Sequence, residues 1–226
     1  MKRQIYIVGL FCATVSLHAA VGGLGGFSLG AGFPGIQNLN DRLKPYGLDL
    51  KSSMVISGGS GYALARHLIL GGFGYGGSVQ SENPDMILEF SGGGGGFEIG
   101  RVWDAGPGWF AVMATLGGFG YSLKIRPKLS DIDFDSLLVQ PRRVAELTTG
   151  SVLVGASGMY IFPVSGPFSL GVKAGIYYTP MARDWALEDG AAVFNAPKLQ
   201  PFHFSVQVML MFGKVVKTMP NTGPSQ

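Results

Sequence analysis

The segment Phe202-His203-Phe204-Ser205-Val206-Gln207-Val208 places an apolar side chain at every second position. Successive side chains of a β-strand point to opposite faces, so this period of two predicts a strand with one apolar and one polar face. The segment from Phe168 to Thr179 alternates in the same way: Phe168, Leu170 and Val172 take turns with small or polar residues. The sequence therefore predicts amphipathic strands, and the rest of the chain decides how many there are.

Working outward from this segment, we find eight strand-like stretches separated by residues typical of turns. They cover about 21–31, 53–65, 68–79, 86–102, 109–125, 151–162, 168–178 and 202–212. An even number of antiparallel strands is typical of bacterial outer-membrane barrels. The expected fold class is thus all-β: an antiparallel up-and-down transmembrane β-barrel of eight strands.

The connections between these stretches differ in length in a regular way. Three are short, at 66–67, 104–108 and 163–167, and three are long, at about 32–52, 126–150 and 180–201; the link at 80–84 is the exception. Outer-membrane barrels have short periplasmic turns at one end and long extracellular loops at the other. A soluble sandwich has no reason to sort its loops in this way.

The faces of two strands follow from the positions of their large residues. In the third stretch we expect Ile69, Phe73, Tyr75 and Val79 to point outward, with Gly72, Gly74 and Gly76 pointing inward. In the fourth stretch the apolar residues Leu88 and Phe90 take even positions, whereas Phe97 and Ile99 take odd ones. A β-bulge within Gly92-Gly93-Gly94-Gly95-Gly96 would explain this change of phase.

Aromatic residues gather near the two ends of the expected strands. Those near the short turns are Trp103, Trp109, Phe162, Phe168 and Phe212; those near the long loops are Phe27, Tyr75, Phe90, Tyr121, Tyr178 and Phe202. Amphipathic rings favour the two interfaces of a membrane, so we expect two aromatic belts. Two long loops have helical spacing and are expected to hold short helices, at about 36–43 and 130–138.

The start of the chain resembles a secretory signal peptide. Lys2 and Arg3 precede an apolar run that ends at Val15, and Ala19 offers a small residue for cleavage. We therefore expect a signal peptide at 1–19, a barrel at 20–213 and a flexible tail at 214–226. Cys12, the only cysteine, falls within the expected leader, which leaves no cysteine for a disulfide, a thiolate metal site or a nucleophile.

Composition supports a chain that faces lipid. Charged residues make up 14% of the sequence, against about 25% in typical soluble domains. Beyond the leader, no apolar run reaches the length of about 18 residues that a membrane-spanning helix needs. A barrel is then the way to satisfy every backbone N–H and C=O in hydrocarbon. No basic patch is interleaved with aromatic residues, so we expect no nucleic-acid partner.

No residue stands out as catalytic, cofactor-binding or metal-binding, and we expect no cofactor. His203 and Ser205 are the most suggestive pair, because residues two apart on a strand share a face. Lipid A deacylases of the outer membrane carry a similar pair with a glutamate on a neighbouring strand, but no acidic residue follows this pair in the chain. We expect both to line the lumen. The polar residues expected mostly in the lumen, paired into a plug, are Glu89, Glu98, Arg101, Lys124, Lys173 and Gln207.

The pattern of strands, loops and aromatic belts resembles the small eight-stranded outer-membrane barrels, the OmpX-like and OmpA-like class. The resemblance implies a monomeric, non-enzymatic protein of the outer membrane, in contact with outer-membrane lipids and acting in envelope structure or in surface contact through its long loops. Its extracellular partner is unknown from the sequence. Two alternatives stay open: a lipid-modifying enzyme using His203 and Ser205, and a soluble exported β-sandwich or small-ligand-binding barrel.

Overall fold

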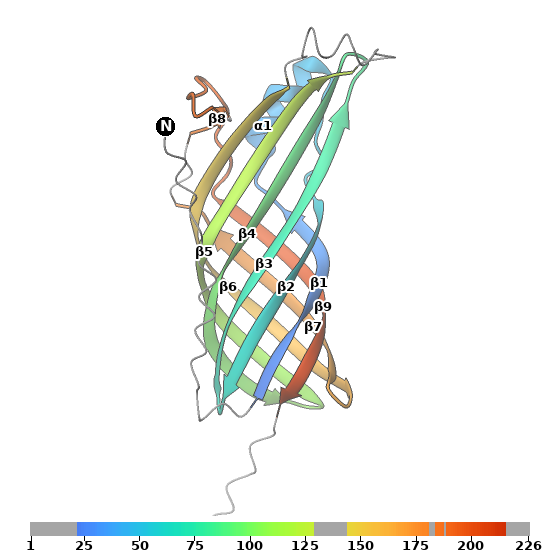
Figure 1. Ribbon diagram of the computed structural model, residues 1–226, viewed down its shortest axis with the longest axis vertical. Coiled ribbons are helices and arrows are strands. Elements are labelled where there is room, and N and C mark those ends of the chain that lie inside the picture. Colours follow the sequence, from blue (N-terminus) through green and yellow to red (C-terminus); the bar gives the residue numbers. More distant parts are fainter. Residues whose placement is uncertain (1–21, 129–143, 181–183, 188, 216–226) are drawn as a thin grey trace, which may run out of the picture.

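Eight long antiparallel strands close into a barrel in the computed structural model, which describes residues 22–128, 144–180, 184–187 and 189–215 (Figure 1). The strands of the barrel are β1 Gly22–Phe33, β2 Met54–Ala65, β3 Leu68–Glu82, β4 Met86–Ala105, β5 Gly108–Pro127, β6 Ala145–Ser165, β7 Phe168–Tyr178 and β9 Phe202–Val215. The ring closes because β9 pairs with both β1 and β7, and β5 pairs with both β4 and β6. The expected eight-stranded architecture is confirmed.

Three two-residue turns join strands at one end of the barrel. They are Arg66-His67, Gly106-Pro107 and Gly166-Pro167. Each contains a residue with positive φ: Arg66 at 55°, Gly106 at 62° and Gly166 at 54°. Left-handed backbone of this kind matches the twist of the flanking strands in a tight hairpin. The strands therefore run closer to the turns than the sequence suggested, and β9 continues two residues beyond the expected end of the barrel.

On β7 and β9 the sequence predicted the two faces correctly. Along β7 exposed and buried residues alternate without a break, with Leu170 and Val172 outside and Lys173 inside. On β9, His203, Ser205 and Gln207 face the interior, as expected. The inner face of these strands carries polar and small side chains together with Tyr177, Met209 and Met211, and apolar side chains cover the outer face.

On β3 the expected orientation is wrong. Ile69 and Tyr75 are buried inside the barrel, and Gly72, Gly74 and Gly76 face outward. The reason is volume, since eight strands leave an interior that side chains must fill. The rings of Phe73 and Tyr75 supply that volume, with centroids 6.0 and 6.4 Å from that of Tyr177 on β7. The large even-numbered residues of β2, Met54, Ile56, Tyr62 and Leu64, are buried inside as well.

The expected β-bulge in the glycine run is also wrong. Pairing of β4 with β5 is continuous from Met86 to Ala105, and even-numbered residues point inward throughout. Leu88 and Phe90 are therefore inside, whereas Phe97 and Ile99 are outside. The register of β4 therefore stays the same, and its surroundings change. Near the head its large apolar residues face inward, and nearer the short turns they face outward.

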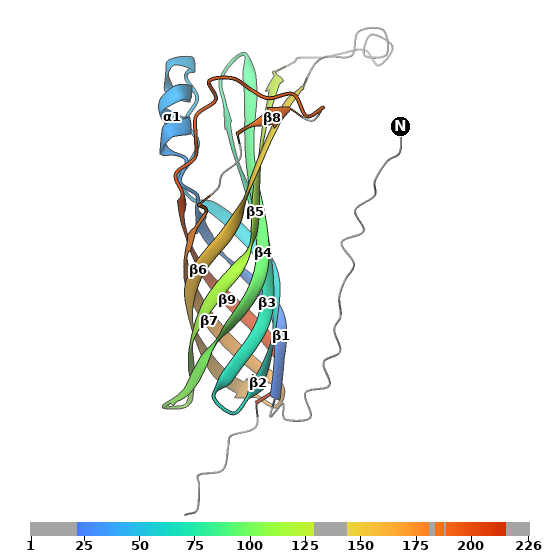
Figure 2. The same cartoon turned by 90° about the vertical axis from the view of Figure 1, so that its left-hand side faces the viewer.

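Strands β3 to β6 continue beyond the closed ring and form the wall of a head at the end opposite the short turns (Figures 1 and 2). Their inner face is covered by helix α1 (Gln37–Leu43), the 3-10 helix η1 (Lys44–Tyr46) and the segment around strand β8 (Ala186–Leu187). Ile36, Leu39 and Trp185 lie in the apolar cluster that joins these parts. The helix expected at 36–43 is confirmed, and the one expected at 130–138 lies outside the described residues, as does the expected leader.

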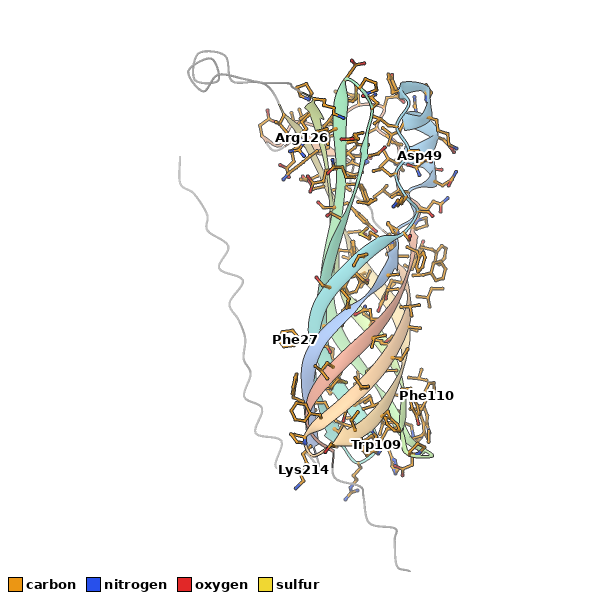
Figure 3. All side chains as sticks on the ribbon, turned by 90° about the vertical axis from the view of Figure 1, so that its right-hand side faces the viewer. Phe27, Asp49, Trp109, Phe110, Arg126 and Lys214 are labelled. Atoms are coloured by element: carbon orange, nitrogen blue, oxygen red, sulfur yellow. The ribbon has the colours of Figure 1, made fainter. Side chains whose placement is uncertain are left out.

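Aromatic residues mark the outer surface differently from the expectation. Those exposed on the outside near the short turns are Trp103, Phe110, Phe162, Phe168 and Phe212, and those at the other end of β1, β7 and β9 are Phe33, Tyr178, Phe202 and Phe204. Trp109, Tyr75, Phe90 and Tyr121, which were expected in the belts, are buried in the interior. Phe27 lies outside, well below the head, and Phe110 near the short turns (Figure 3). The belt near the turns is therefore the better defined of the two.

Candidate functional site

The interior of the barrel holds a buried ion pair with a complete set of hydrogen bonds. Glu98 Oε2 on β4 lies 2.6 Å from Lys173 Nζ on β7. The same oxygen accepts a hydrogen bond from Tyr62 on β2 at 2.7 Å. Its other oxygen accepts from Thr115 at 3.1 Å and from Ser157 at 2.8 Å, on β5 and β6. Four donors around one carboxylate offset much of the cost of removing its charge from water.

Lys173 is held as closely as its partner. Its ammonium group also donates to the Tyr62 hydroxyl at 3.1 Å and lies 4.3 Å from the ring centroid of Phe73 on β3. A cation over an aromatic face gains further attraction when it is desolvated. We call Tyr62, Glu98, Thr115, Ser157 and Lys173 the interior cluster. It ties together five strands, β2, β4, β5, β6 and β7.

Apolar side chains close the barrel on both sides of the interior cluster. The group toward the short turns includes Leu64, Ile69, Val102, Met113, Met159, Ile161, Met209 and Met211. The group toward the head includes Ile56, Leu88, Phe90, Phe119, Tyr121, Leu123, Leu153 and Tyr177. Along β4 the inward series Phe90, Glu98, Val102 passes from one group through the cluster to the other. The barrel is thus filled, and the interior cluster lies between two groups of mainly apolar side chains.

The structure places His203 and Ser205 inside the barrel, as expected. The contacts of the His203 ring are with Tyr121, Thr179 and Phe119. Its Nδ1 is 2.7 Å from the Tyr121 hydroxyl, its Nε2 is 3.0 Å from Thr179 Oγ1, and the Phe119 ring stacks on it at 5.6 Å. Ser205 is contacted by the Gln207 amide at 3.4 Å. In the described part of the chain, no carboxylate forms a hydrogen bond with His203.

Three of the six polar residues expected mostly in the lumen lie outside it. Glu98, Lys173 and Gln207 are buried inside, whereas Glu89, Arg101 and Lys124 are on the outer face. Lys124 forms a half-exposed ion pair with Glu146 of β6 at 3.5 Å, and Arg101 lies 5.8 Å from the Trp103 ring. The expected plug exists, although its main partners, the hydroxyls of Tyr62, Thr115 and Ser157, were not identified from the sequence.

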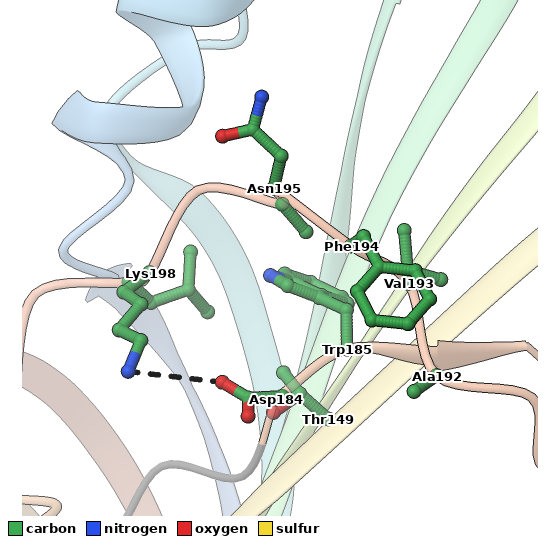
Figure 4. Close-up of a pocket in the computed structure, with 10 residues that line it drawn as sticks. Thr149, Asp184, Trp185, Ala192, Val193, Phe194, Asn195 and Lys198 are labelled. Atoms are coloured by element: carbon green, nitrogen blue, oxygen red, sulfur yellow. Dashed lines mark ion pairs between the residues drawn. The ribbon is translucent and has the colours of Figure 1, made fainter.

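The head contains an open cavity next to β8 (Figure 4). Its volume is about 300 Å³, and its apolar lining includes Trp185, Val193 and Leu199. Asp184 and Lys198 form an exposed ion pair at its edge, with Nζ and Oδ1 3.7 Å apart. Phe194 stands beside the cavity with 92% of its surface exposed. This combination of an apolar pocket, an exposed ring and charges at the edge is the candidate site; we call it the head pocket.

Among the described residues, no three His, Cys, Asp or Glu side chains come together in a way that could hold a metal ion. Within the same residues, no helix is both long and apolar enough to cross a bilayer.

These features define a closed and filled eight-stranded antiparallel barrel that carries a folded head. The resemblance to small outer-membrane barrels is confirmed for this architecture. No family model matches the chain, and no curated protein matches it.

Solved structures that resemble the chain include those of three bacterial proteins. Neisserial surface protein A has a TM-score of 0.44 and 9% identity, over 85% of this chain and 97% of that one. Ail, the attachment invasion locus protein of Yersinia pestis, has a TM-score of 0.42 and 9% identity, over 85% and 99%. A major outer membrane protein from Thermus thermophilus has a TM-score of 0.46 and 11% identity, over 84% and 99%. Likeness at this level carries no inference about function.

Proposed function

We propose that this protein is an integral outer-membrane barrel whose role is contact at the cell surface through its head, without enzymatic activity. The observation that carries the proposal is the outer surface of the closed ring. Outward positions such as Leu116, Leu170 and Val208 are apolar and exposed, and an aromatic row follows at the end with the short turns. Exposed apolar area of this extent is costly in water and matches the band that a membrane barrel presents to lipid.

The filled interior argues for contact as the role, in preference to transport. A pore needs a continuous wet path, and here Met113, Met159 and Met211 close one side of the interior cluster while Phe90 and Leu88 close the other. The head, in contrast, is folded around its own apolar core and has a pocket open to solvent. Binding sites on rigid scaffolds are commonly located on such connecting segments.

Fractionation combined with surface labelling tests this proposal. We expect the protein to stay with the membrane fraction in carbonate and high salt, and to be released by detergent as a band whose migration shifts on heating. A membrane-impermeant amine reagent applied to intact cells should label Lys51 and Lys198 of the head. A protein found in the carbonate supernatant would exclude a membrane barrel, and a membrane-bound protein that labels only after lysis would exclude a role at the surface.

A further inference from the structure

One arginine lies on the outer face of the closed ring, where the surrounding side chains are apolar or small. Arg101 of β4 is exposed there, and its partners in the sheet are Leu68 of β3 and Val112 of β5, which are 46% and 44% exposed. Apart from Lys214 at the end of β9 (Figure 3), no other charged residue of a described strand faces outward between the head and the short turns. A charge in a wall that faces lipid has a cost that an apolar residue avoids.

The aromatic row near the short turns holds this charge in place. Strand β4 ends at Ala105, four residues beyond Arg101. A tilted strand rises roughly 2.5 Å per residue along the barrel axis, so Arg101 lies about 10 Å above that end. Its guanidinium carbon is 5.8 Å from the ring centroid of Trp103, and Trp103 stacks on Phe110 with centroids 6.3 Å apart. Such rings favour the membrane interface, so they keep the guanidinium group close to the lipid head groups.

A second guanidinium group belongs to the same corner of the barrel. The turn between β2 and β3 consists of Arg66 and His67, both exposed. The Val102 N–H donates to the His67 carbonyl at 2.9 Å. The turn therefore lies beside the part of β4 that carries Arg101, and it brings the side chain of Arg66 to this end of the outer face.

Neither guanidinium group is neutralised by the protein. Within the described residues, Arg66 and Arg101 have no ion pair and no side-chain hydrogen bond. Glu98 and Asp104, the acidic residues of β4 on either side of Arg101, occupy inward positions on the strand. The corner thus presents positive charge on its outer side, and it is complementary to an anion at the membrane interface.

We propose that this corner, formed by Arg66, Arg101 and Trp103, binds the phosphate group of an anionic phospholipid in the periplasmic leaflet, the side on which such barrels place their short turns. Arg101 donates to the phosphate oxygens as a planar fork, and Arg66 supplies the second positive charge. A lipid fits better than a soluble anion, because its acyl chains cover the exposed Leu68 and Val112 in the same binding event. This inference rests on the proposed function, since it requires the closed ring to lie in a bilayer.

Trp103 is a natural reporter for this lipid, because it is 41% exposed whereas Trp109 and Trp185 are 7% and 4% exposed. The full-length protein is refolded into phosphatidylcholine vesicles that contain a small, increasing share of one lipid brominated in its acyl chains. That lipid is either phosphatidylglycerol or phosphatidylcholine. Bromine quenches tryptophan on contact, and the Trp103→Phe protein gives the background from the other two. We expect phosphatidylglycerol to reach half-maximal quenching at a share about fivefold or more lower than phosphatidylcholine.

Three variants test which residues carry this preference. Arg101→Gln should remove most of it and Arg66→Gln part of it, because each removes one positive charge from the corner. Arg126→Gln is the matched control, at an exposed arginine on the outer face of β5 in the head (Figure 3), and it should leave the preference unchanged. Each variant must keep the heat-dependent shift of the folded barrel. In the parent the preference should weaken as the salt concentration rises, because salt screens exposed charges.

Equal quenching of the parent by the two brominated lipids would overturn the inference. So would a preference that Arg101→Gln leaves intact, or one that Arg126→Gln reduces as strongly. In each of these cases, quenching by both lipids still supports a closed ring in the bilayer. Quenching by neither lipid, together with recovery of the protein in the carbonate supernatant, would contradict the proposed function as well.

Discussion

Glu98 and Lys173 face each other across the interior of the barrel with Oε2 and Nζ 2.6 Å apart, and both side chains are almost completely removed from solvent. They belong to strands that are not neighbours, β4 and β7, so their contact spans the interior. Three hydroxyl groups complete the coordination of the carboxylate. The pair therefore connects opposite walls of the barrel. It also places two charges in the interior, and each depends on the other for compensation.

Breaking this pair on one side should be costly. Glu98→Gln leaves the Lys173 ammonium buried without a counter-charge, and we expect a loss of about 3–5 kcal/mol in the free energy of unfolding. Glu98→Gln combined with Lys173→Met removes both charges while the amide keeps the Thr115 and Ser157 hydroxyls bonded, so most of that loss should be recovered. Urea unfolding in lipid vesicles measures both. A double variant as unstable as the single one would contradict this account.

The outer pair of Lys124 and Glu146 is the matched control for this experiment. It is half exposed, with Nζ and Oε2 3.5 Å apart. Exposed pairs contribute about 0–1 kcal/mol, so Lys124→Met should change the unfolding free energy little.

The filled interior predicts that the protein does not conduct ions. Water would have to cross both the methionine-rich layer near the short turns and the aromatic layer below the head. Purified protein in planar bilayers should show no discrete conductance steps at moderate voltage. Reproducible single-channel steps, absent from a mock preparation, would mean that one of these layers opens.

An arginine introduced on the outer surface should destabilise the protein in the lower barrel and be tolerated in the head. Leu116 faces outward between Phe97 of β4 and Val154 of β6. Leu116→Arg should cost about 2–4 kcal/mol in vesicles, because we place that position in hydrocarbon. Gln80→Arg, on the outer face of β3 within the head, should fall within about 0.5 kcal/mol of the parent. Equal effects at the two positions would contradict the assignment of the band.

Asn40 should hold the loop that follows α1. Its buried side chain donates to the Leu50 carbonyl at 2.7 Å and accepts from the Leu50 N–H at 3.1 Å. Asn40→Ala leaves both backbone groups without these partners, at a cost of about 1–3 kcal/mol for each buried group. We expect trypsin to cleave after the exposed Lys51 faster than in the parent, while the barrel keeps its heat-dependent shift.

Gln37→Ala is the matched control for the loop. Gln37 is an exposed residue of the same helix, with one weak bond to Asp41 at 3.4 Å. Its replacement should leave the cleavage rate unchanged. A rate for Asn40→Ala no higher than that of this control would show that the two bonds to Leu50 do not hold the loop.

Much of the fold could be predicted from the sequence because the signal is local. The period of two in residues 168–179 and 202–208 predicts both the strand and its apolar outer face. Adjacent Gly and Pro residues mark two of the tight turns. Periodicity also says that a strand has two different faces. It does not say which face is inside, and on β3 the bulky face filled the interior because closure demanded volume.

The sites could not be predicted to the same degree because they depend on register. The contacts of the Glu98 carboxylate with Tyr62, Thr115 and Ser157 follow from the register between neighbouring strands from β2 to β6. The local sequence does not distinguish these three hydroxyl groups from others in the chain. The phase change between Phe90 and Phe97 was visible in the sequence. Its cause, the passage from the head to the lower barrel, required knowledge of what packs on each face.

The most direct test of the membrane barrel is the depth of single labels in the bilayer. Cys12 is the only cysteine of the chain, so its replacement by alanine allows one fluorophore to be placed on Val206→Cys or on Gln80→Cys. We predict that lipids carrying a nitroxide in the acyl chain quench the label at position 206 strongly and the label at position 80 hardly at all. Equal quenching at both positions, or none at position 206, would contradict a barrel whose lower wall lies in lipid and whose head stands in water.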